Sequence, residues 1–294
     1  MIKNVHFNIG NMIWILKGVY MKIYDLLCNT NAEMFKGKTF EDSEKNEISE
    51  IFLSSVNTIE EFSKFRENIS YKDPDGGKYL YPSFFIPPYN NKKYRLITGE
   101  LPKTYILSTN HYELEILRIL ILWNKDNPKV HSMVGETIKR LNKSCFGNFC
   151  AAGECTSTGI SALRFLSVLN IKNEKWIEKI LLPLIERFNL IKTGTDAIKY
   201  NVPIFYLYSV LPDISNQLCY DLVESKKEWL INNLIKGWLT SIKQSDLDSY
   251  SVTRKYVLRN TLAMLPEYEY IKNKEIYISG KDNRCYFDIT KNLF

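Results

Sequence analysis

The segment LRFLSVLN at residues 163–170 ends a predicted amphipathic helix, and three other segments of the chain resemble it. These segments are LRILILWN at 117–124, FYLYSVLPD at 205–213 and LRNTLAMLPE at 258–267. Equivalent positions in the four segments are separated by 46, 42 and 54 residues. A period of roughly 40 to 50 residues with two helices per unit is typical of stacked helix pairs, which bury a continuous core only when neighbours stack. The sequence therefore predicts an all-α fold of α/α hairpin repeats over residues 108–270.

A short polar turn and a second helix are expected after each of the first three segments. The first two turns, NKDNPKV at 124–130 and NIKNEKW at 170–176, match in detail. Pro128 stands in the first turn of the following helix, where its missing N–H costs nothing. We therefore expect helix pairs that either close into a ring or stay open as a superhelix.

The part of the chain before the repeats divides into two segments. Residues 1–72 are predicted to be helical, because apolar residues recur at helical spacing over 42–69, with Asp42 as the expected N-cap. Residues 73–107 are rich in proline and aromatic side chains. Proline prevents a regular helix, so we expect an extended segment that packs across the helical body.

Residues 271–294 are predicted to form a C-terminal cap. Apolar and polar residues alternate in KEIYISGKDNRCYFDI at 274–289, on both sides of a Gly-Lys-Asp-Asn turn. This pattern is typical of a β-hairpin. We expect the hairpin to cover the last repeat.

The charge and cysteine content favour a globular protein of a reducing compartment. The 39 basic and 33 acidic residues are interspersed and give a net charge of +6, without a basic arm that would indicate nucleic-acid binding. Six cysteines without a pairing pattern indicate the cytoplasm. The apolar stretch Met12–Met21 contains Lys17 and is shorter than the ~20 residues of a membrane span. No transmembrane segment is therefore expected, and this stretch is either a core helix or an extension ahead of a start at Met21.

Several catalytic motifs are absent from the sequence. It contains no Walker A motif, no dinucleotide-binding glycine motif, no HExxH and no GxSxG. Histidine occurs only at positions 6, 111 and 131, which leaves few members for a histidine-dependent triad. Nucleotide-driven and serine-hydrolase chemistry are therefore not expected.

The segment LNKSCFGNFCAAGECTSTGISALRFLSVLN at 141–170 contains a Phe-Gly turn, a polar loop, a Thr/Ser-rich helix start and an aliphatic helix. With these features in this order, the segment resembles the repeat of the terpenoid-cyclase and protein-prenyltransferase α/α toroids. The resemblance implies a toroid or partial toroid, in which the first helix of each pair lines a central cavity. It also implies an apolar substrate that is isoprenoid-like or linked to a peptide.

Four carboxylates are candidate catalytic groups. In the repeat register Glu154 aligns with Asp196, and the equivalent position of the fourth unit falls two residues beyond Asp248. Clustered carboxylates in a partly desolvated cavity raise one another's pKa, which keeps a protonated general acid available. The run DLDS at 246–249 resembles the Asp-x-Asp-Asp acid motif of class II terpene cyclases, with serine in place of the last acid. This resemblance implies Asp248 as proton donor and Asp246 as its support, while the alternative is that these acids cap helices.

A cysteine run is the second candidate site. Cys145, Cys150 and Cys155 form C-x4-C-x4-C, and His131 lies one helix upstream. Thiolates and an imidazole can hold zinc, and the toroid resemblance implies a zinc that activates a thiol. The spacing differs from the C-x2-C of structural zinc sites, so the alternatives are buried apolar side chains or a redox thiol. We expect no cofactor other than this zinc.

Three aromatic side chains, Phe146, Phe149 and Tyr206, are expected at the mouth of the cavity as substrate-binding groups, because aromatic faces hold cations and apolar chains. Ordinary core packing is the alternative. The leading hypothesis is an enzyme that acts on an apolar small molecule or peptide by carboxylic-acid proton donation in an aromatic-lined cavity. The alternatives are a non-catalytic helical-repeat scaffold that binds a peptide or protein, and a Cys-cluster metal or redox protein. The oligomeric state stays open.

Overall fold

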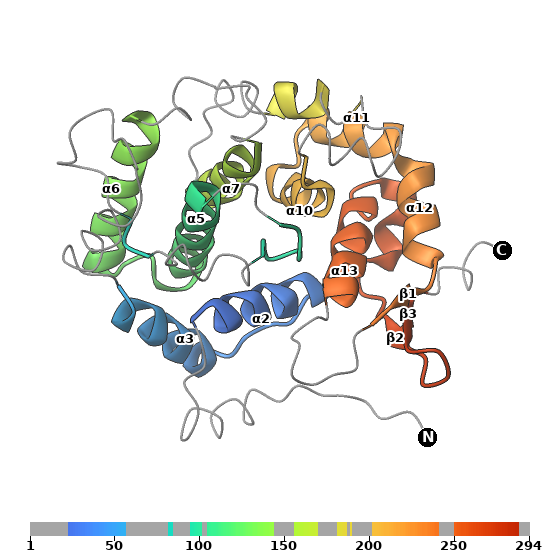
Figure 1. Ribbon diagram of the computed structural model, residues 1–294, viewed down its shortest axis with the longest axis horizontal. Coiled ribbons are helices and arrows are strands. Elements are labelled where there is room, and N and C mark those ends of the chain that lie inside the picture. Colours follow the sequence, from blue (N-terminus) through green and yellow to red (C-terminus); the bar gives the residue numbers. More distant parts are fainter. Residues whose placement is uncertain are drawn as a thin grey trace.

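The computed structural model describes residues 23–56, 82–84, 95–101, 105–143, 156–169, 181–186, 189, 202–240 and 250–287. This part of the chain is mostly helical, in agreement with the predicted fold class (Figure 1). The principal helices are α2 (Ile23–Lys36), α3 (Asp42–Ser54), α5 (Tyr105–Asn124), α6 (Pro128–Lys143), α7 (Thr156–Ser167), α10 (Ile204–Ile214), α11 (Gln217–Ser225), α12 (Lys227–Ile235), α13 (Tyr250–Leu262) and the 3-10 helix η3 (Pro266–Ile271).

The four similar sequence segments begin in α5, α7, α10 and α13, but the second continues beyond the end of α7 at Ser167 and the fourth beyond the end of α13 at Leu262. The first segment ends together with α5 at Asn124, as predicted, whereas the third occupies nearly all of α10. Equivalent positions are not equally buried, since Leu122 is 44% exposed and Val210 is fully buried. The segments therefore share an element type but not one packing register.

The start of α6 confirms the prediction made from proline. The helix begins at Pro128, which needs no N–H acceptor in the first turn. The side-chain oxygen of Asn127 accepts a hydrogen bond from the N–H of Lys129 at 2.9 Å. This bond satisfies one of the free N–H groups at the helix start.

The start of α3 differs from the prediction, because Glu41 rather than Asp42 is the N-cap. The carboxylate of Glu44 accepts the backbone N–H of Glu41 at 2.9 Å, which is half of a capping box. Asp42 instead lies in the first turn and pairs with Lys45 at 2.8 Å. A glutamate three residues after the cap therefore sets the helix start one residue earlier than predicted.

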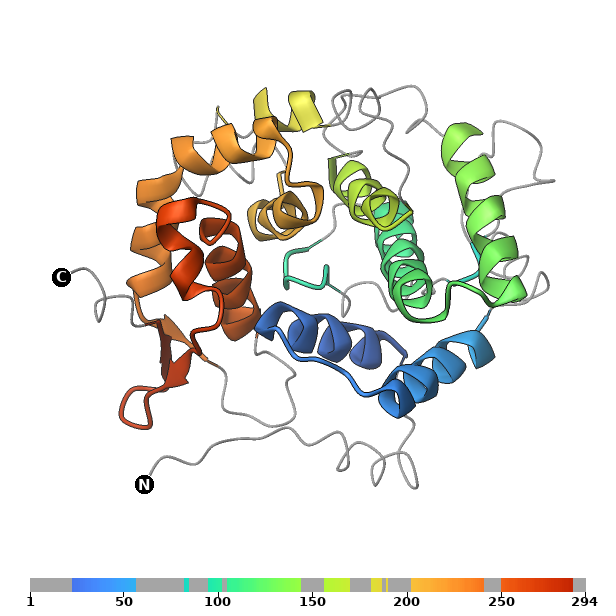
Figure 2. The ribbon, with the colours of Figure 1, turned by 180° about the vertical axis from the view of Figure 1, so that it is seen from behind.

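Helix contacts run in a circuit. Helix α5 packs against α7, α7 against α10 and α10 against α13, while α2 contacts both α13 and α5. In the views from both sides, α6 lies outside α5 and α12 lies outside α13 (Figure 1 and Figure 2).

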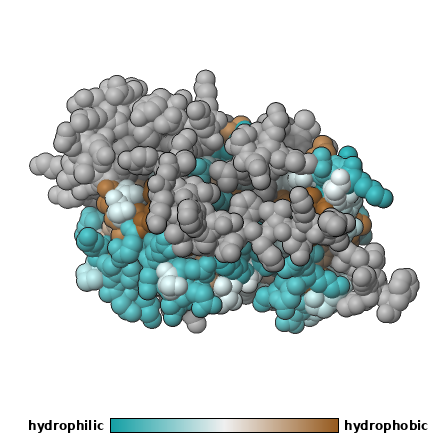
Figure 3. All heavy atoms as spheres, turned by 90° about the horizontal axis from the view of Figure 1, so that it is seen from below, coloured by the Kyte–Doolittle hydropathy of each residue, from teal (hydrophilic) through white to brown (hydrophobic). Residues whose placement is uncertain are grey.

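Described residues on the lower face are mostly hydrophilic (Figure 3). None of the described helices combines the length and the apolar character of a membrane span.

A turn at residues 95–101, buried at positions 96–99, lies between α2 and α10 and is called the plug segment below. The hydroxyl of Tyr24 on α2 accepts from the N–H of Arg95 at 2.8 Å and donates to its carbonyl at 2.9 Å. Gly99 has a φ of +82°, and a Cβ at this position would overlap the ring of Tyr250. Glycine is therefore required both for the turn and for the close approach of α13.

The plug segment also caps α10. The carboxylate of Glu100 accepts the N–H groups of Phe205 and Tyr206, each at 3.0 Å. The N-cap residue of α10 is Pro203, whose side chain cannot accept a hydrogen bond. A residue far away in the sequence thus satisfies the first turn of this helix.

Part of the predicted extended segment packs against the helices. Phe84 is fully buried, and the N–H of Ser83 donates to the carboxylate of Glu113 on α5 at 2.7 Å. The stretch 1–22, with the predicted N-terminal apolar helix, lies outside the described residues.

The C-terminal hairpin is present as predicted. Strand β2 (Tyr277–Ile278) pairs antiparallel with β3 (Arg284–Tyr286), and Asn283 in the turn has a φ of 55°. The other edge of β3 pairs with β1 (Trp238–Leu239), which follows α12. The hairpin therefore joins a three-stranded sheet of order β1-β3-β2.

Candidate functional site

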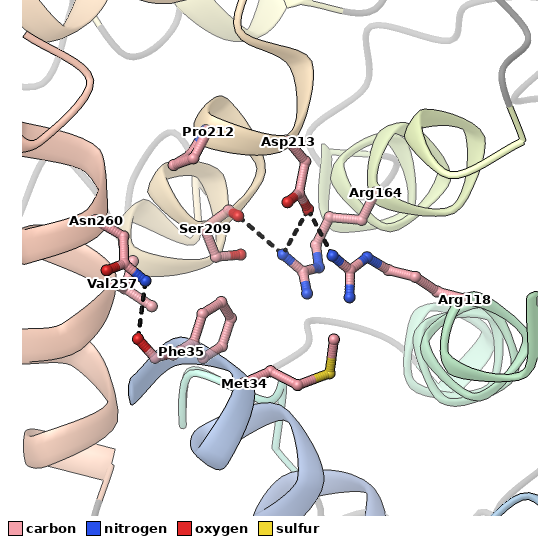
Figure 4. Close-up of a pocket in the computed structure, with 9 residues that line it drawn as sticks. All are labelled: Met34, Phe35, Arg118, Arg164, Ser209, Pro212, Asp213, Val257 and Asn260. Carbon is pink, nitrogen blue, oxygen red and sulfur yellow. Dashed lines mark hydrogen bonds and ion pairs between the residues drawn. The ribbon is translucent and has the colours of Figure 1, made fainter. Parts of the chain in front are cut away.

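A pocket of about 250 Å³ lies where α2, α5, α7, α10 and α13 meet, and each of these helices contributes to its wall. Two guanidinium groups and a carboxylate lie together, and Met34 and Phe35 of α2 line the pocket beside them, with the ring of Phe35 5.3 Å from the guanidinium carbon of Arg164 (Figure 4). The pocket therefore combines a charged cluster with apolar side chains. Its lining residues are Met34, Phe35, Arg118, Arg164, Ser209, Pro212, Asp213, Val257 and Asn260.

Arg164 on α7 is 1% exposed and has acceptors for all three of its nitrogens. Its Nε donates to Oε1 of Glu115 at 2.7 Å. Its Nη1 donates to the carbonyl of Ser209 at 2.8 Å and to Oδ2 of Asp213 at 3.1 Å, and its Nη2 donates to Oδ1 of Asn31 at 3.2 Å. This guanidinium joins α7 to α5, α10 and α2.

Arg118 on α5 is also buried, at 6% exposed, but it is poorly satisfied. Its Nη2 donates to Oδ2 of Asp213 at 3.0 Å. Its Nε and Nη1 are buried and have no hydrogen-bond partner within the described part of the chain. The guanidinium points into the pocket beside Asp213, whose side chain is 26% exposed (Figure 4). Buried N–H groups are almost always paired, so this arginine needs an acceptor.

A hydrogen-bonded chain connects the pocket with the plug segment. The N–H of Ile97 donates to Nε2 of His111 at 3.2 Å, so that Nε2 is the unprotonated nitrogen. The proton is therefore on Nδ1, which donates to the hydroxyl of Tyr206 at 2.9 Å. The hydroxyl of Tyr206 then donates to Oε1 of Glu115 at 2.7 Å, the same oxygen that accepts from Arg164.

The pKa values of these groups follow from burial and from charge pairing. Burial lowers the pKa of His111 to about 4, which keeps the imidazole neutral. Burial opposes the ionisation of Glu115, but Arg164, His111 and Arg118 together with the hydrogen bond from Tyr206 outweigh it, and the pKa of Glu115 is lowered. Glu115 and Asp213 likewise outweigh burial at Arg164 and raise its pKa.

The pKa of Arg118 shifts the other way. Burial and the like charge of Arg164 lower it, and the attraction of Asp213 and Glu115 does not compensate. The surroundings of Arg164 therefore stabilise its charged form and satisfy its N–H groups. The surroundings of Arg118 do neither fully.

A proline inside α10 leaves one carbonyl of this region without its usual helical donor. Pro212 has no N–H to donate to the carbonyl of Tyr208. The carbonyl of Tyr208 accepts instead from the hydroxyl of Thr261 on α13 at 3.0 Å. The next carbonyl, that of Ser209, accepts from Arg164.

Most site residues predicted from the sequence lie outside the described residues. The exceptions are His131, which is exposed on α6, and Tyr206, which is fully buried. Tyr206 donates to Glu115 and is thus linked through this one carboxylate to the pocket arginine Arg164. The predicted residues that are not described are Glu154, Asp196, Asp246, Asp248, Phe146, Phe149, Cys145, Cys150 and Cys155.

Within the described residues, no three His, Cys, Asp or Glu side chains converge as a metal site requires. The possible zinc site at the cysteine run thus stays a prediction, without support from the described part of the chain.

The arginines of the pocket were missed in the sequence, although a signal for them exists. Arg118 and Arg164 each follow a leucine within an otherwise apolar helical stretch, at 117–124 and 163–170. An arginine on the buried side of an apolar helix must be paired or bind a ligand.

Comparison with family models, with curated proteins and with solved structures finds no match for this chain.

Proposed function

We propose that this protein binds a small, partly apolar molecule in the pocket between α2, α5, α7, α10 and α13. The observation that carries the proposal is a cavity of about 250 Å³ whose lining combines charged groups with apolar side chains. Small-molecule sites are typically concave, largely apolar and equipped with a few convergent polar groups. Side chains from five helices meet here, so the site depends on the complete helix circuit.

The helix circuit also supports our proposal that the protein is a partial α/α toroid. In such a fold the inner helices surround a central site and the outer helices cover them. The contacts from α5 through α7, α10 and α13 to α2 and back to α5 agree with this arrangement. The plug segment and the pocket would then lie along the inside of the circuit.

A test of binding can use Met34, which lines the pocket from α2 and is only partly buried. In protein labelled with ¹³C at the methionine methyls, small single-ring compounds are expected to shift the Met34 signal on titration. Because variants at position 34 lack this methyl group, their binding is measured by calorimetry. Met34→Trp fills the pocket and should abolish the heat of binding, while Met34→Ala enlarges the pocket and should keep it. If Met34→Trp binds the compounds as well as the wild type does, the pocket is not the site.

The predicted enzyme activity remains a proposal beyond this binding. Proton donation by Glu154 or Asp248, supported by Asp246 and Asp196, would act on an apolar substrate held near the same helices. Substitution of Asp248 by Asn is expected to abolish turnover and to leave ligand binding in the pocket intact. A peptide-binding scaffold and a thiol metal or redox protein stay the alternative proposals.

A further inference from the structure

The hydrogen bonds of the two pocket arginines indicate which class of ligand the pocket binds. Arg164 and Arg118 both donate to Oδ2 of Asp213, but Arg164 has three further acceptors. Glu115 is hydrogen-bonded to Arg164 and also attracts the charge of Arg118, although its Oε2 has no hydrogen-bond partner among the described residues. Arg118 therefore shares one carboxylate oxygen of Asp213 with Arg164 and has two buried nitrogens without a hydrogen-bond partner among the described residues.

We infer that the ligand carries an oxyanion, a carboxylate or a phosphate ester, that accepts hydrogen bonds from Arg118. This inference rests on the proposed binding of a small molecule in the pocket. Planar guanidinium N–H groups match the oxygens of carboxylate and phosphate groups, and such charge-assisted bonds are about twice as strong as neutral ones. A neutral acceptor would satisfy the N–H groups but would leave the charge of Arg118 poorly compensated.

The apolar side chains of the pocket indicate where the rest of the ligand lies. Met34 and Phe35 of α2 and Val257 of α13 form the apolar part of the wall, and the ring of Phe35 lies 5.3 Å from the guanidinium carbon of Arg164 (Figure 4). An anionic head on Arg118 therefore directs an apolar body toward these side chains. The ligand class is a small organic acid or phosphate ester with an apolar or aromatic body.

Asp213 would compete with the ligand. Two arginines and two carboxylates make the cluster neutral, so an added anion leaves one negative charge in excess. The side chain of Asp213 is partly exposed and can turn toward solvent or take up a proton, whereas Glu115 is fully buried. Removing the charge of Asp213 should therefore strengthen anion binding, and removing that of Arg118 should weaken it.

Three probes of similar shape test the inference in the full chain: benzoate, phenyl phosphate and the neutral benzamide. Binding is followed by the methionine methyl signals. At least one anion is expected to bind the wild type about tenfold more tightly than benzamide does. A preference for benzoate identifies the natural head group as a carboxylate, and a preference for phenyl phosphate identifies it as a phosphate ester.

Two substitutions should act in opposite directions. Arg118→Met is expected to remove the preference for anions, because it weakens the binding of the anions about tenfold more than that of benzamide. Asp213→Asn keeps an acceptor oxygen and should tighten anion binding about tenfold. A general loss of structure cannot produce both results. Lys139→Met, on the exposed face of α6, is the control and should change neither affinity.

The outcomes separate this inference from the proposed function. Equal affinities for the anions and benzamide, unaffected by Arg118→Met, would overturn the oxyanion inference while the pocket remained a binding site. Absence of any response of Met34 to all three probes would overturn both.

Discussion

Among single residues, Arg164 and Arg118 share Oδ2 of Asp213 and differ in nearly every other contact. Arg164 compensates the buried carboxylate of Glu115, whereas no buried acid depends on Arg118 alone. Removing one partner of a buried ion pair leaves the other charge unpaired, which costs more than the pair itself contributes. The two arginines should therefore differ sharply in their effect on stability.

We expect Arg164→Met to lower the free energy of unfolding by about 3–5 kcal/mol. Arg118→Met should change it by about 1 kcal/mol or less, because it removes a poorly paired charge and leaves Asp213 bonded to Arg164. Urea denaturation followed by circular dichroism measures both values. Equal losses for the two variants would show that Arg118 is as well compensated as Arg164.

His111 should make the stability depend on pH. Its pKa of about 4 in the folded protein lies below its ordinary value of 6.5, so the folded state binds fewer protons than the unfolded state. The stabilisation is complete above pH 6.5 and is lost as the pH falls toward 4. Between pH 7.5 and pH 5, His111 should account for about 2 kcal/mol.

The matched variants for this pH dependence are His111→Gln and His131→Gln. The first should flatten the decline in stability between pH 7.5 and pH 5, measured by urea denaturation at each pH. The second removes an exposed histidine of α6 and should leave the decline as it is in the wild type. An unchanged decline in His111→Gln would mean that other groups cause it.

The residues of the site show how far the sequence predicts function. The repeated segments identified the helices that carry Arg118, Arg164 and Tyr206, but these arginines were counted as parts of a repeat rather than as buried charges. Pairing of Arg164 with Glu115 and Asp213 joins three helices, and such contacts depend on tertiary packing that periodicity does not contain. Tyr206 was selected as aromatic, although its hydroxyl makes the contacts described here.

Among the helices, α13 stabilises the ends of two others through side chains one turn apart. The ammonium of Lys255 donates to the carbonyls of Asn233, Leu234 and Lys236 at the end of α12. Arg259 donates through Nη2 to the carbonyl of Phe35 at the end of α2 at 2.9 Å. Cations at helix C-termini satisfy free carbonyls and interact favourably with the helix dipole.

Lys255→Met should lower the free energy of unfolding by about 3 kcal/mol, because three carbonyls at the end of α12 lose their charged donor in a buried position. Thermal and urea unfolding measure the loss. Lys272→Met, which removes an exposed lysine, should change stability by about 0.5 kcal/mol or less. A similar small effect at both positions would mean that the carbonyls are satisfied without Lys255.

Glu100→Ala should expose the first turn of α10. Its loss leaves the N–H groups of Phe205 and Tyr206 without their acceptor, at a cost of about 2 kcal/mol. Hydrogen exchange of these two amides is expected to accelerate more than exchange elsewhere in α10. Glu50→Ala, at an exposed position of α3, is the control, and equal exchange in both variants would contradict capping by Glu100.

Helix starts and turns were predicted correctly where residues close in the sequence determine the backbone conformation. Pro128 begins α6, and the Gly-Lys-Asp-Asn turn forms the hairpin, because proline and left-handed turn residues act on their own backbone. The cap of α3 was missed by one residue, since Glu44 also had to be considered. The cap of α10 is supplied by Glu100 from the plug segment, and no local pattern contains that partner.

For the whole molecule, α2 connects the two ends of the helix series. Its contacts with α13 and α5 complete the circuit, and Asn31 and Phe35 meet side chains of α7 and α13. The sequence predicted the stacked helices from the repeats, but it did not predict that the N-terminal segment packs among them. The repeat region should therefore depend on the segment before it.

We expect the isolated fragment 108–270 to lack a cooperative thermal transition, because it loses α2 and the plug segment together. The full chain should unfold in one transition, measured by circular dichroism and calorimetry. A cooperative transition in the fragment would instead mean that the helix repeats form an independent domain.

The carbonyl of Ser209 gives the pocket an acceptor that a substitution of Ser209 itself cannot remove. The partner of Nη1 of Arg164 is a main-chain oxygen, so any residue at position 209 offers the same oxygen. Genetic variation can reach this contact only through its donor, Arg164, or through a change that disrupts α10 as a whole. A screen of tolerated substitutions should thus find the pocket sensitive at position 164 and permissive toward small side chains at position 209.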